Sequence, residues 1–263
     1  MPAATAPYDA RPMHSETLDY SDGTTTMEAY LAFDRSRQGP RPVVVICHAW
    51  AGQDDFARSR AEHMASLGYL GFALDVYGKG RRGNSPQENA ALMEPFVKDR
   101  GMLLSRLRAA VHTARHHDRA DLHRVAVMGY CFGGLCALDV ARAGLEGVVG
   151  AVSFHGLFAP SPLPPGPRPM RTRVLALHGW NDPMVRPDAV LGLAKELTDA
   201  GCDWTLEAYG HRGHAFTNQA ANDPQGGMRY CPRAERRANA AAEEFLREIF
   251  ADAQPEVGAV RAP

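Results

Sequence analysis

The segment Gly-Tyr-Cys-Phe-Gly-Gly, residues 129–134, holds the side chain best suited to chemistry in this chain, the thiol of Cys131. An apolar, strand-like run precedes it and a helix-forming run follows it. A sharp turn from strand to helix has no room for side chains two residues before and after its tip, where Gly129 and Gly133 stand. Backbone N–H groups at the start of a helix favour a thiolate. The pattern predicts a nucleophile elbow with Cys131 at its tip.

Two other interpretations of this turn have to be weighed. A buried structural cysteine beside a glycine turn is one, and it stays open at the level of sequence. A dinucleotide-binding turn of the form Gly-x-Gly-x-x-Gly is the other. It fails because Cys131 stands where the second glycine is required.

An acid and a base follow the nucleophile in the chain order that such a turn requires. Asp182 comes after a strand-like run at 174–178, and His214 lies in a glycine-rich loop after the last predicted strand. We expect His214 to be the base and Asp182 to orient it. An Asx turn ahead of Pro183 is the alternative for Asp182. A metal site at His211 and His214 is disfavoured because no cysteine or carboxylate cluster accompanies them, so we expect no metal and no cofactor.

The loop after the first main strand, residues 47–52, is where a second oxyanion donor is expected. The backbone N–H groups of Trp50 and Phe132 would converge on a developing oxyanion, a contact worth about 3 kcal/mol of the barrier. Cys47 and His48 are expected in the core or in support of the site. Aromatic residues near strand ends either line a pocket or pack in the core, and the sequence leaves both open.

The elements that must position these residues alternate between strand and helix. We predict strands at 43–47, 70–74, 125–128, 148–154, 174–178 and 204–209, and helices at 56–67, 86–116, 133–143, 187–200 and 234–250. Crossovers of that length give a mostly parallel central sheet with helices on both faces, an α/β class fold. Segments 16–20 and 26–33, which flank Asp22-Gly23, predict an N-terminal antiparallel hairpin at the sheet edge. The proline-rich run 159–169 is expected to be a loop at the rim of the active site.

Composition narrows the classes of protein. The chain has 263 residues and a formal net charge of -1, so neither nucleic acid nor an anionic membrane is an expected partner. No signal-like or membrane-spanning run occurs, and the five cysteines are odd in number and lack Cys-x-x-Cys spacing, so we expect a cytoplasmic protein with reduced thiols. We expect a single domain at 14–252, a leader at 1–13 and a tail at 253–263.

These motifs together resemble the dienelactone hydrolase family of the α/β-hydrolase superfamily. The resemblance is carried by Gly-Tyr-Cys-Phe-Gly-Gly around Cys131, His-Gly-x-x-Asp-Pro around Asp182, Gly-His-Ala-Phe around His214, and Asp-Val-Tyr-Gly from Asp75. It extends roughly from Thr26 to Phe250. The resemblance implies an α/β-hydrolase fold, a Cys-His-Asp triad and a small ester or lactone as substrate, in a monomer or weak homodimer.

The chain departs from the family at the residues that meet the substrate. Namesake members have a glutamate that holds the resting thiol, where this chain has Ala49, so direct deprotonation by His214 is expected. They also bind the lactone carboxylate with two arginines, where this chain has Lys79 and Asn218. A neutral or weakly acidic ester or lactone is therefore expected to be better than dienelactone. The residues expected to line the substrate pocket are Tyr77, Lys79, Trp180, Phe216 and Asn218.

The expected reaction is acyl transfer through a thioester on Cys131, with esters and lactones ranked above peptides. A non-catalytic thiol sensor or binding protein on the same scaffold is the alternative from another class. The predicted acid and base argue against it. A serine-type peptidase relative would need serine at 131 and usually a longer lid domain, and neither is present.

Overall fold

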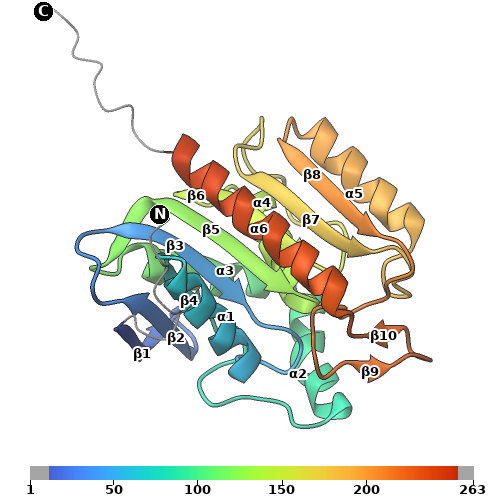
Figure 1. Ribbon diagram of the computed structural model, residues 1–263, viewed down its shortest axis with the longest axis horizontal. Coiled ribbons are helices and arrows are strands. Elements are labelled where there is room, and N and C mark those ends of the chain that lie inside the picture. Colours follow the sequence, from blue (N-terminus) through green and yellow to red (C-terminus); the bar gives the residue numbers. More distant parts are fainter. Residues whose placement is uncertain (1–11, 254–263) are drawn as a thin grey trace, which may run out of the picture.

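The chain folds around one eight-stranded sheet, as seen in a computed structural model that describes residues 12–253 (Figure 1). The strand order is β1-β2-β4-β3-β5-β6-β7-β8. Pairing is antiparallel from β1 through β2 to β4 and parallel across the rest of the sheet. The strands are β1 Met13–Ser21, β2 Thr26–Asp34, β3 Arg41–Cys47, β4 Leu70–Ala73, β5 Ala120–Tyr130, β6 Val148–Phe154, β7 Arg173–Gly179 and β8 Trp204–Tyr209.

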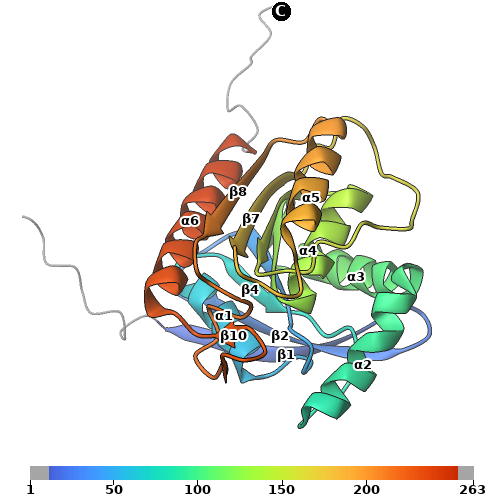
Figure 2. The same cartoon turned by 90° about the vertical axis from the view of Figure 1, so that its right-hand side faces the viewer.

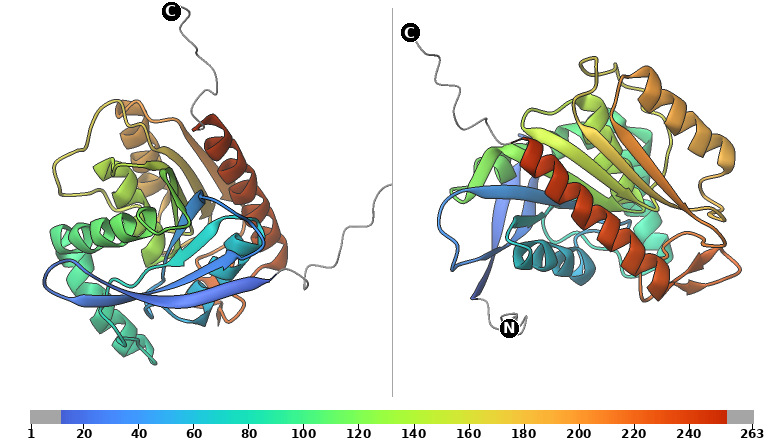
Figure 3. Two further views of the ribbon diagram at one scale, coloured as in Figure 1. Left: turned by 90° about the vertical axis from the view of Figure 1, so that its left-hand side faces the viewer. Right: turned by 45° about the horizontal axis from the view of Figure 1, so that its top comes forward.

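Helices cover both faces of this sheet, as Figures 2 and 3 show edge-on. One face packs against α1 and α6, and the other against α3, α4 and α5. The helices are α1 Asp55–Ser66, α2 Pro86–Lys98, α3 Arg100–Arg115, α4 Phe132–Ala143, α5 Pro187–Asp199 and α6 Pro232–Asp252. The predicted mostly parallel sheet with helices on both faces and an antiparallel N-terminal hairpin is confirmed.

The central strands are apolar on both faces because helices cover both. In β3, Val43 and Val45 pack into the cluster under α3 and α4, while Val44 and Ile46 pack into the cluster under α1 and α6. All four side chains have no exposed surface. Parallel strands then end at one edge, so the loops after β3, β5, β7 and β8 meet at the carboxyl edge of the sheet.

The predicted single helix at 86–116 is wrong, because the structure divides it into α2 and α3. Asp99 ends α2 and caps α3, and its side chain accepts a hydrogen bond from the N–H of Met102 at 2.8 Å. Asp99 has φ −112° and ψ 89°, which no helical residue adopts. A carboxylate that satisfies the first turn of α3 therefore starts a new helix.

The proline-rich segment 159–169 is not an active-site rim loop, so that prediction is also wrong. The N–H of Gly166 bonds to the carbonyl of Arg142 near the end of α4, and Arg168 donates to the carbonyl of Asp199 at the end of α5. Those helix ends lie at the edge of the sheet opposite to Cys131, which precedes the start of α4. The segment replaces a crossover helix between β6 and β7.

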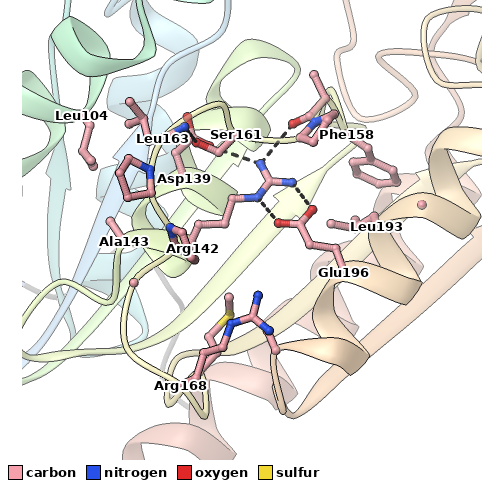
Figure 4. A pocket seen from close by; sticks show the side chains of 18 of the residues that line it. Leu104, Asp139, Arg142, Ala143, Phe158, Ser161, Leu163, Arg168, Leu193 and Glu196 are labelled. Atoms are coloured by element: carbon pink, nitrogen blue, oxygen red, sulfur yellow. Dashed lines mark hydrogen bonds and ion pairs between the residues drawn. The ribbon is translucent and has the colours of Figure 1, made fainter.

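A cavity of about 480 Å³ lies between this segment, α4 and α5 (Figure 4). Its walls are mostly apolar, and Arg142 extends along it to bind Glu196 through two hydrogen bonds of 2.7 and 2.8 Å. None of Cys131, Asp182 and His214 lines it. The cavity is therefore separate from the residues predicted to do the chemistry.

Two short strands, β9 Asn222–Asp223 and β10 Met228–Arg229, form a small ribbon that the sequence analysis did not predict. The backbone N–H of His214 donates to the carbonyl of Gly227 in the turn between them. Residues 1–11 and 254–263, most of the predicted leader and tail, lie outside the described residues. No helix within 12–253 has the length and apolar character needed to span a membrane.

Candidate active site

Cys131 lies at the tip of a sharp turn between β5 and α4. Its backbone φ is 57°, in the left-handed region that side chains disfavour. A Cβ on Gly129 would lie 2.0 Å from the carbonyl oxygen of Gly133, and a Cβ on Gly133 would lie 2.1 Å from that of Cys47. Glycine is therefore required at both positions, as the predicted elbow demands. The Cys131 side chain is only partly buried.

Asp182 and His214 meet at the same edge of the sheet from two different loops. Nδ1 of His214 lies 2.7 Å from Oδ2 of Asp182, and both side chains are buried. The other carboxylate oxygen of Asp182 accepts a hydrogen bond of 2.8 Å from the N–H of Met184. The N–H of Asn181 donates to the carbonyl of Arg212, which ties the two loops together. This geometry leaves Nε2 of His214 as the ring nitrogen available for proton transfer.

The electrostatics favour a protonated ring at His214. Burial by itself lowers the pKa of His214, but the hydrogen bond to Asp182 and the nearby side chain of Cys131 outweigh burial and raise it to about 10. Among the described residues, Nε2 has no hydrogen-bond partner within normal distance, so the Cys131 contribution reflects proximity rather than a formed bond.

Buried side chains hold the loop that carries Trp50 in place. The Tyr77 hydroxyl donates a hydrogen bond of 3.0 Å to the carbonyl of Trp50, and the Tyr77 ring stacks on Phe132. His48 packs edge-on against Tyr77, and its Nε2 accepts a hydrogen bond from the N–H of Val76. Within 12–253, neither the backbone N–H of Trp50 nor that of Phe132 donates a hydrogen bond outside the helices and strands.

Four of the five residues expected to line the pocket have other roles. Lys79 binds Asp19 at 2.7 Å and approaches Glu28 at 3.5 Å, so its charge is neutralised at the protein surface. Asn218 is exposed and caps its own turn through the N–H of Ala220. The rings of Tyr77 and Phe216 are fully buried in the core. Trp180, beside the acid loop, is 47% exposed and can meet a substrate.

The sequence analysis did not identify two buried histidines that lie near the site. His155 directly follows β6, and its ring centroid lies 5.2 Å from that of His214. His178 is the last residue but one of β7, packs against Phe158, and has no hydrogen-bond partner for either ring nitrogen among residues 12–253. Their positions at the carboxyl ends of two predicted strands were the signal that could have found them.

A metal site at His211 and His214 finds no support in the geometry. His211 is exposed, whereas the ring of His214 is buried against Asp182. Across residues 12–253, no three side chains of His, Cys, Asp or Glu gather where they could hold a metal ion.

Comparisons with known proteins agree with the geometry. The model of the "Dienelactone hydrolase family" matches residues 27–250. An uncharacterized protein of Caenorhabditis elegans is 32% identical over 152 residues, which make up 57% of this chain and 96% of that protein. The carboxymethylenebutenolidase of Pseudomonas putida is 30% identical over 128 residues, which make up 46% of this chain and 52% of that enzyme.

Two solved structures extend the similarity over most of the chain. The structure named m3DLH has a TM-score of 0.83 and 34% identity, and the match covers 90% of this chain and 99% of that one. The dienelactone hydrolase-like promiscuous phosphotriesterase P91 from metagenomic libraries has a TM-score of 0.84 and 29% identity, with the same coverage. The α/β-hydrolase fold expected from the motifs is thus confirmed.

Proposed function

Because the chain belongs to the dienelactone hydrolase family, we propose that it hydrolyses a small carboxylic ester or lactone with Cys131 as nucleophile. The observation that carries the proposal is the buried 2.7 Å hydrogen bond between Nδ1 of His214 and Asp182, in a ring close enough to Cys131 for this residue to raise its pKa. His214 acts as base and acid, and Asp182 holds its ring in one tautomer.

Acylation begins when the Cys131 thiolate attacks the substrate carbonyl carbon and forms a carbon–sulfur bond. The negative charge moves to the carbonyl oxygen, where the N–H groups of Trp50 and Phe132 donate to it. The tetrahedral intermediate then collapses, the carbon–oxygen bond to the leaving group breaks, and His214 gives its proton to the departing alkoxide. The product is a thioester on Cys131 and a neutral His214.

Deacylation repeats these steps with water as the nucleophile. Neutral His214 takes a proton from water while the oxygen attacks the thioester carbonyl. The same two backbone N–H groups stabilise the second oxyanion. The carbon–sulfur bond breaks, the acid leaves, and the imidazolium of His214 remains beside the regenerated thiolate.

The preferred substrate is a neutral or weakly acidic ester or lactone. At the two positions where the family's namesakes bind a carboxylate, Lys79 is already paired with Asp19 and Asn218 caps a surface turn. The exposed apolar side chains beside the acid are Trp180 and Met184, which are 47% and 50% exposed. They suit an uncharged acyl or leaving group.

The first prediction tests the nucleophile. Cys131→Ala should lower kcat/KM for p-nitrophenyl acetate by at least about 10³-fold, because no other group in the proposed reaction forms the thioester. Steady-state p-nitrophenol release is the measurement. The control is Cys202→Ala, which removes a partly exposed thiol just before β8, at the opposite edge of the sheet, and should keep wild-type activity. Wild-type turnover by Cys131→Ala would exclude the proposal.

A thiol sensor on the same scaffold makes a different prediction for the same reaction. A sensor would accumulate a stable acetyl adduct on Cys131 and release no acetate. The enzyme proposed here should release both p-nitrophenol and acetate over many turnovers. Intact-protein mass spectrometry during the reaction separates the two, since a lasting stoichiometric adduct without acid release would favour the sensor.

A further inference from the structure

His155 is a buried imidazole at the site that has no part in the proposed reaction. It directly follows β6 at the carboxyl edge of the sheet, and only 2% of its surface is exposed. The N–H of Cys131 bonds to the carbonyl of Phe154, the residue before it. His155 therefore stands beside the turn that carries the nucleophile.

Its backbone is held in a disfavoured conformation. Among residues 12–253, four residues other than glycine have positive φ: Cys131, His155, His211 and Ala215. All four lie in loops at the carboxyl edge, and two of them are the proposed nucleophile and the neighbour of His214. A left-handed conformation persists in a residue with a side chain only where its surroundings enforce it, and such residues cluster at functional sites.

The contacts of His155 lead to the loop of the proposed base. Nε2 of His155 lies 2.8 Å from the hydroxyl oxygen of Thr217, in a fully buried hydrogen bond. The backbone N–H of His155 donates to the carbonyl of Leu177 at 2.8 Å. Its ring meets the ring of His214 at a centroid distance of 5.2 Å and an interplanar angle of 67°. The side chain of His155 thus contacts the ring of His214 and is hydrogen-bonded to Thr217, which lies three residues after His214.

The charges around His155 keep it neutral. Burial, and then the neighbouring charge of His214, lower its pKa well below the usual value for histidine, and His178 adds to this effect. The remaining polar aromatic group near it is Tyr130, with ring centroids 6.0 Å apart. A neutral ring packs against the imidazolium of His214 without repulsion, in the tilted geometry that aromatic rings favour.

We propose that His155 is a positioning residue. Its ring is hydrogen-bonded to Thr217 and holds the ring of His214 in the orientation that points Nε2 toward Cys131. The inference rests on the proposed function, because it assigns His155 a task within that reaction. His214 is fixed to Asp182 at one atom, Nδ1, and a single hydrogen bond leaves the ring free to pivot about it. The edge-to-face contact with His155 removes that freedom, and Nε2 stays aligned for both proton transfers.

The test compares variants that separate the ring from its anchor. His155→Ala removes the ring and should lower kcat for p-nitrophenyl acetate by about 10- to 100-fold with little change in KM, because a tilted base slows proton transfer without touching the substrate. His155→Phe restores a ring of similar shape and should recover most of this loss. Thr217→Val removes the anchor alone and should give a smaller loss of kcat.

In each variant, kcat is referred to the amount of folded protein, measured by circular dichroism. Three results would overturn the proposal: unchanged kcat in His155→Ala, a rise in KM at constant kcat, or no recovery in His155→Phe. If His155→Ala does not fold, the kcat values of Thr217→Val and His155→Phe decide, and wild-type kcat in Thr217→Val overturns it. Wild-type turnover of p-nitrophenyl acetate by Cys131→Ala would instead refute the proposed function.

Discussion

At the scale of single residues, the hydrogen bond between Asp182 and His214 has two effects. It fixes the tautomer of the ring, because Nδ1–H donates to the carboxylate and Nε2 is left for the proton transfers of the proposed reaction. It also raises the pKa of His214, together with Cys131, against the lowering effect of burial. A raised pKa means that the imidazolium of His214 persists to higher pH, so the protonated ring is populated in neutral and moderately alkaline solution.

Replacing Asp182 should remove both effects. We expect Asp182→Asn to lower kcat by about 10²- to 10⁴-fold, because the amide can present its NH₂ group and select the wrong tautomer. The alkaline limb of the acylation rate should also move to lower pH, since the group that raises the pKa of His214 is gone. Pre-steady-state p-nitrophenol release, measured from neutral to alkaline pH with buffer blanks subtracted, checks both.

The matched control is Asp188→Asn, at the start of α5 in the same connection between β7 and β8. It removes one negative charge without touching His214, so the pH profile should stay at its wild-type position. An alkaline limb at the wild-type position in Asp182→Asn would contradict the assigned role of Asp182.

At the scale of elements, Asp99 shows how one side chain ends one helix and starts another. The carboxylate accepts from the N–H of Met102 and caps α3, while its own backbone N–H bonds to the carbonyl of Pro95 in α2. The break redirects the chain so that the apolar side of α3, with Leu103 and Leu107, packs on the sheet. If the helix continued without a break, α2 would lie along the axis of α3.

Removing this cap should destabilise the protein. Asp99→Ala should lower the free energy of unfolding by about 1 kcal/mol, because the first-turn N–H of Met102 loses its acceptor. Asp99→Asn keeps an oxygen in the same place and should remain within a few tenths of a kcal/mol of wild type. Urea denaturation followed by circular dichroism measures both, and equal losses in the two variants would argue against capping.

At the scale of the whole molecule, buried ion pairs join the helices that cover the face of the sheet beneath Cys131. Asp139 of α4 binds Arg100 of α3 in a bidentate pair, with 2% of the Asp139 side chain and 3% of the Arg100 side chain exposed. Arg142, one turn further along α4, bridges Asp139 and Glu196 of α5. We propose that residues 14–252 form a single domain, because these pairs and two continuous apolar cores connect all the helices to one sheet.

Removing a carboxylate from this network of buried ion pairs should destabilise the protein. Asp139→Ala leaves the guanidinium of Arg100 buried without its carboxylate, and the free energy of unfolding should fall by about 3 to 5 kcal/mol. Glu94→Ala breaks a surface pair with Lys98, whose side chain is 72% exposed, and should change the stability by no more than about 0.5 kcal/mol. Thermal unfolding of both variants measures the contrast, and similar losses would show that burial is not the decisive factor.

Local pattern was enough to predict much of this protein. The glycines around Cys131 and the alternation of apolar runs depend on residues close together in the chain, and the order of Cys131, Asp182 and His214 can be read directly from the sequence. The fold, the family and the strand positions followed from them and are confirmed. The roles of the three residues remain predictions, although the structure brings Asp182 and His214 into direct contact.

Only the tertiary structure decided which residues are free to meet a substrate and which are used for support. Lys79 is neutralised by Asp19, sixty residues away, and the Phe216 ring is buried between Tyr209 and His155. The proline-rich run lies at the end of α4 rather than at the active-site rim. In each case the deciding contact joins segments distant in sequence, and periodicity and spacing carry information only about neighbours along the chain.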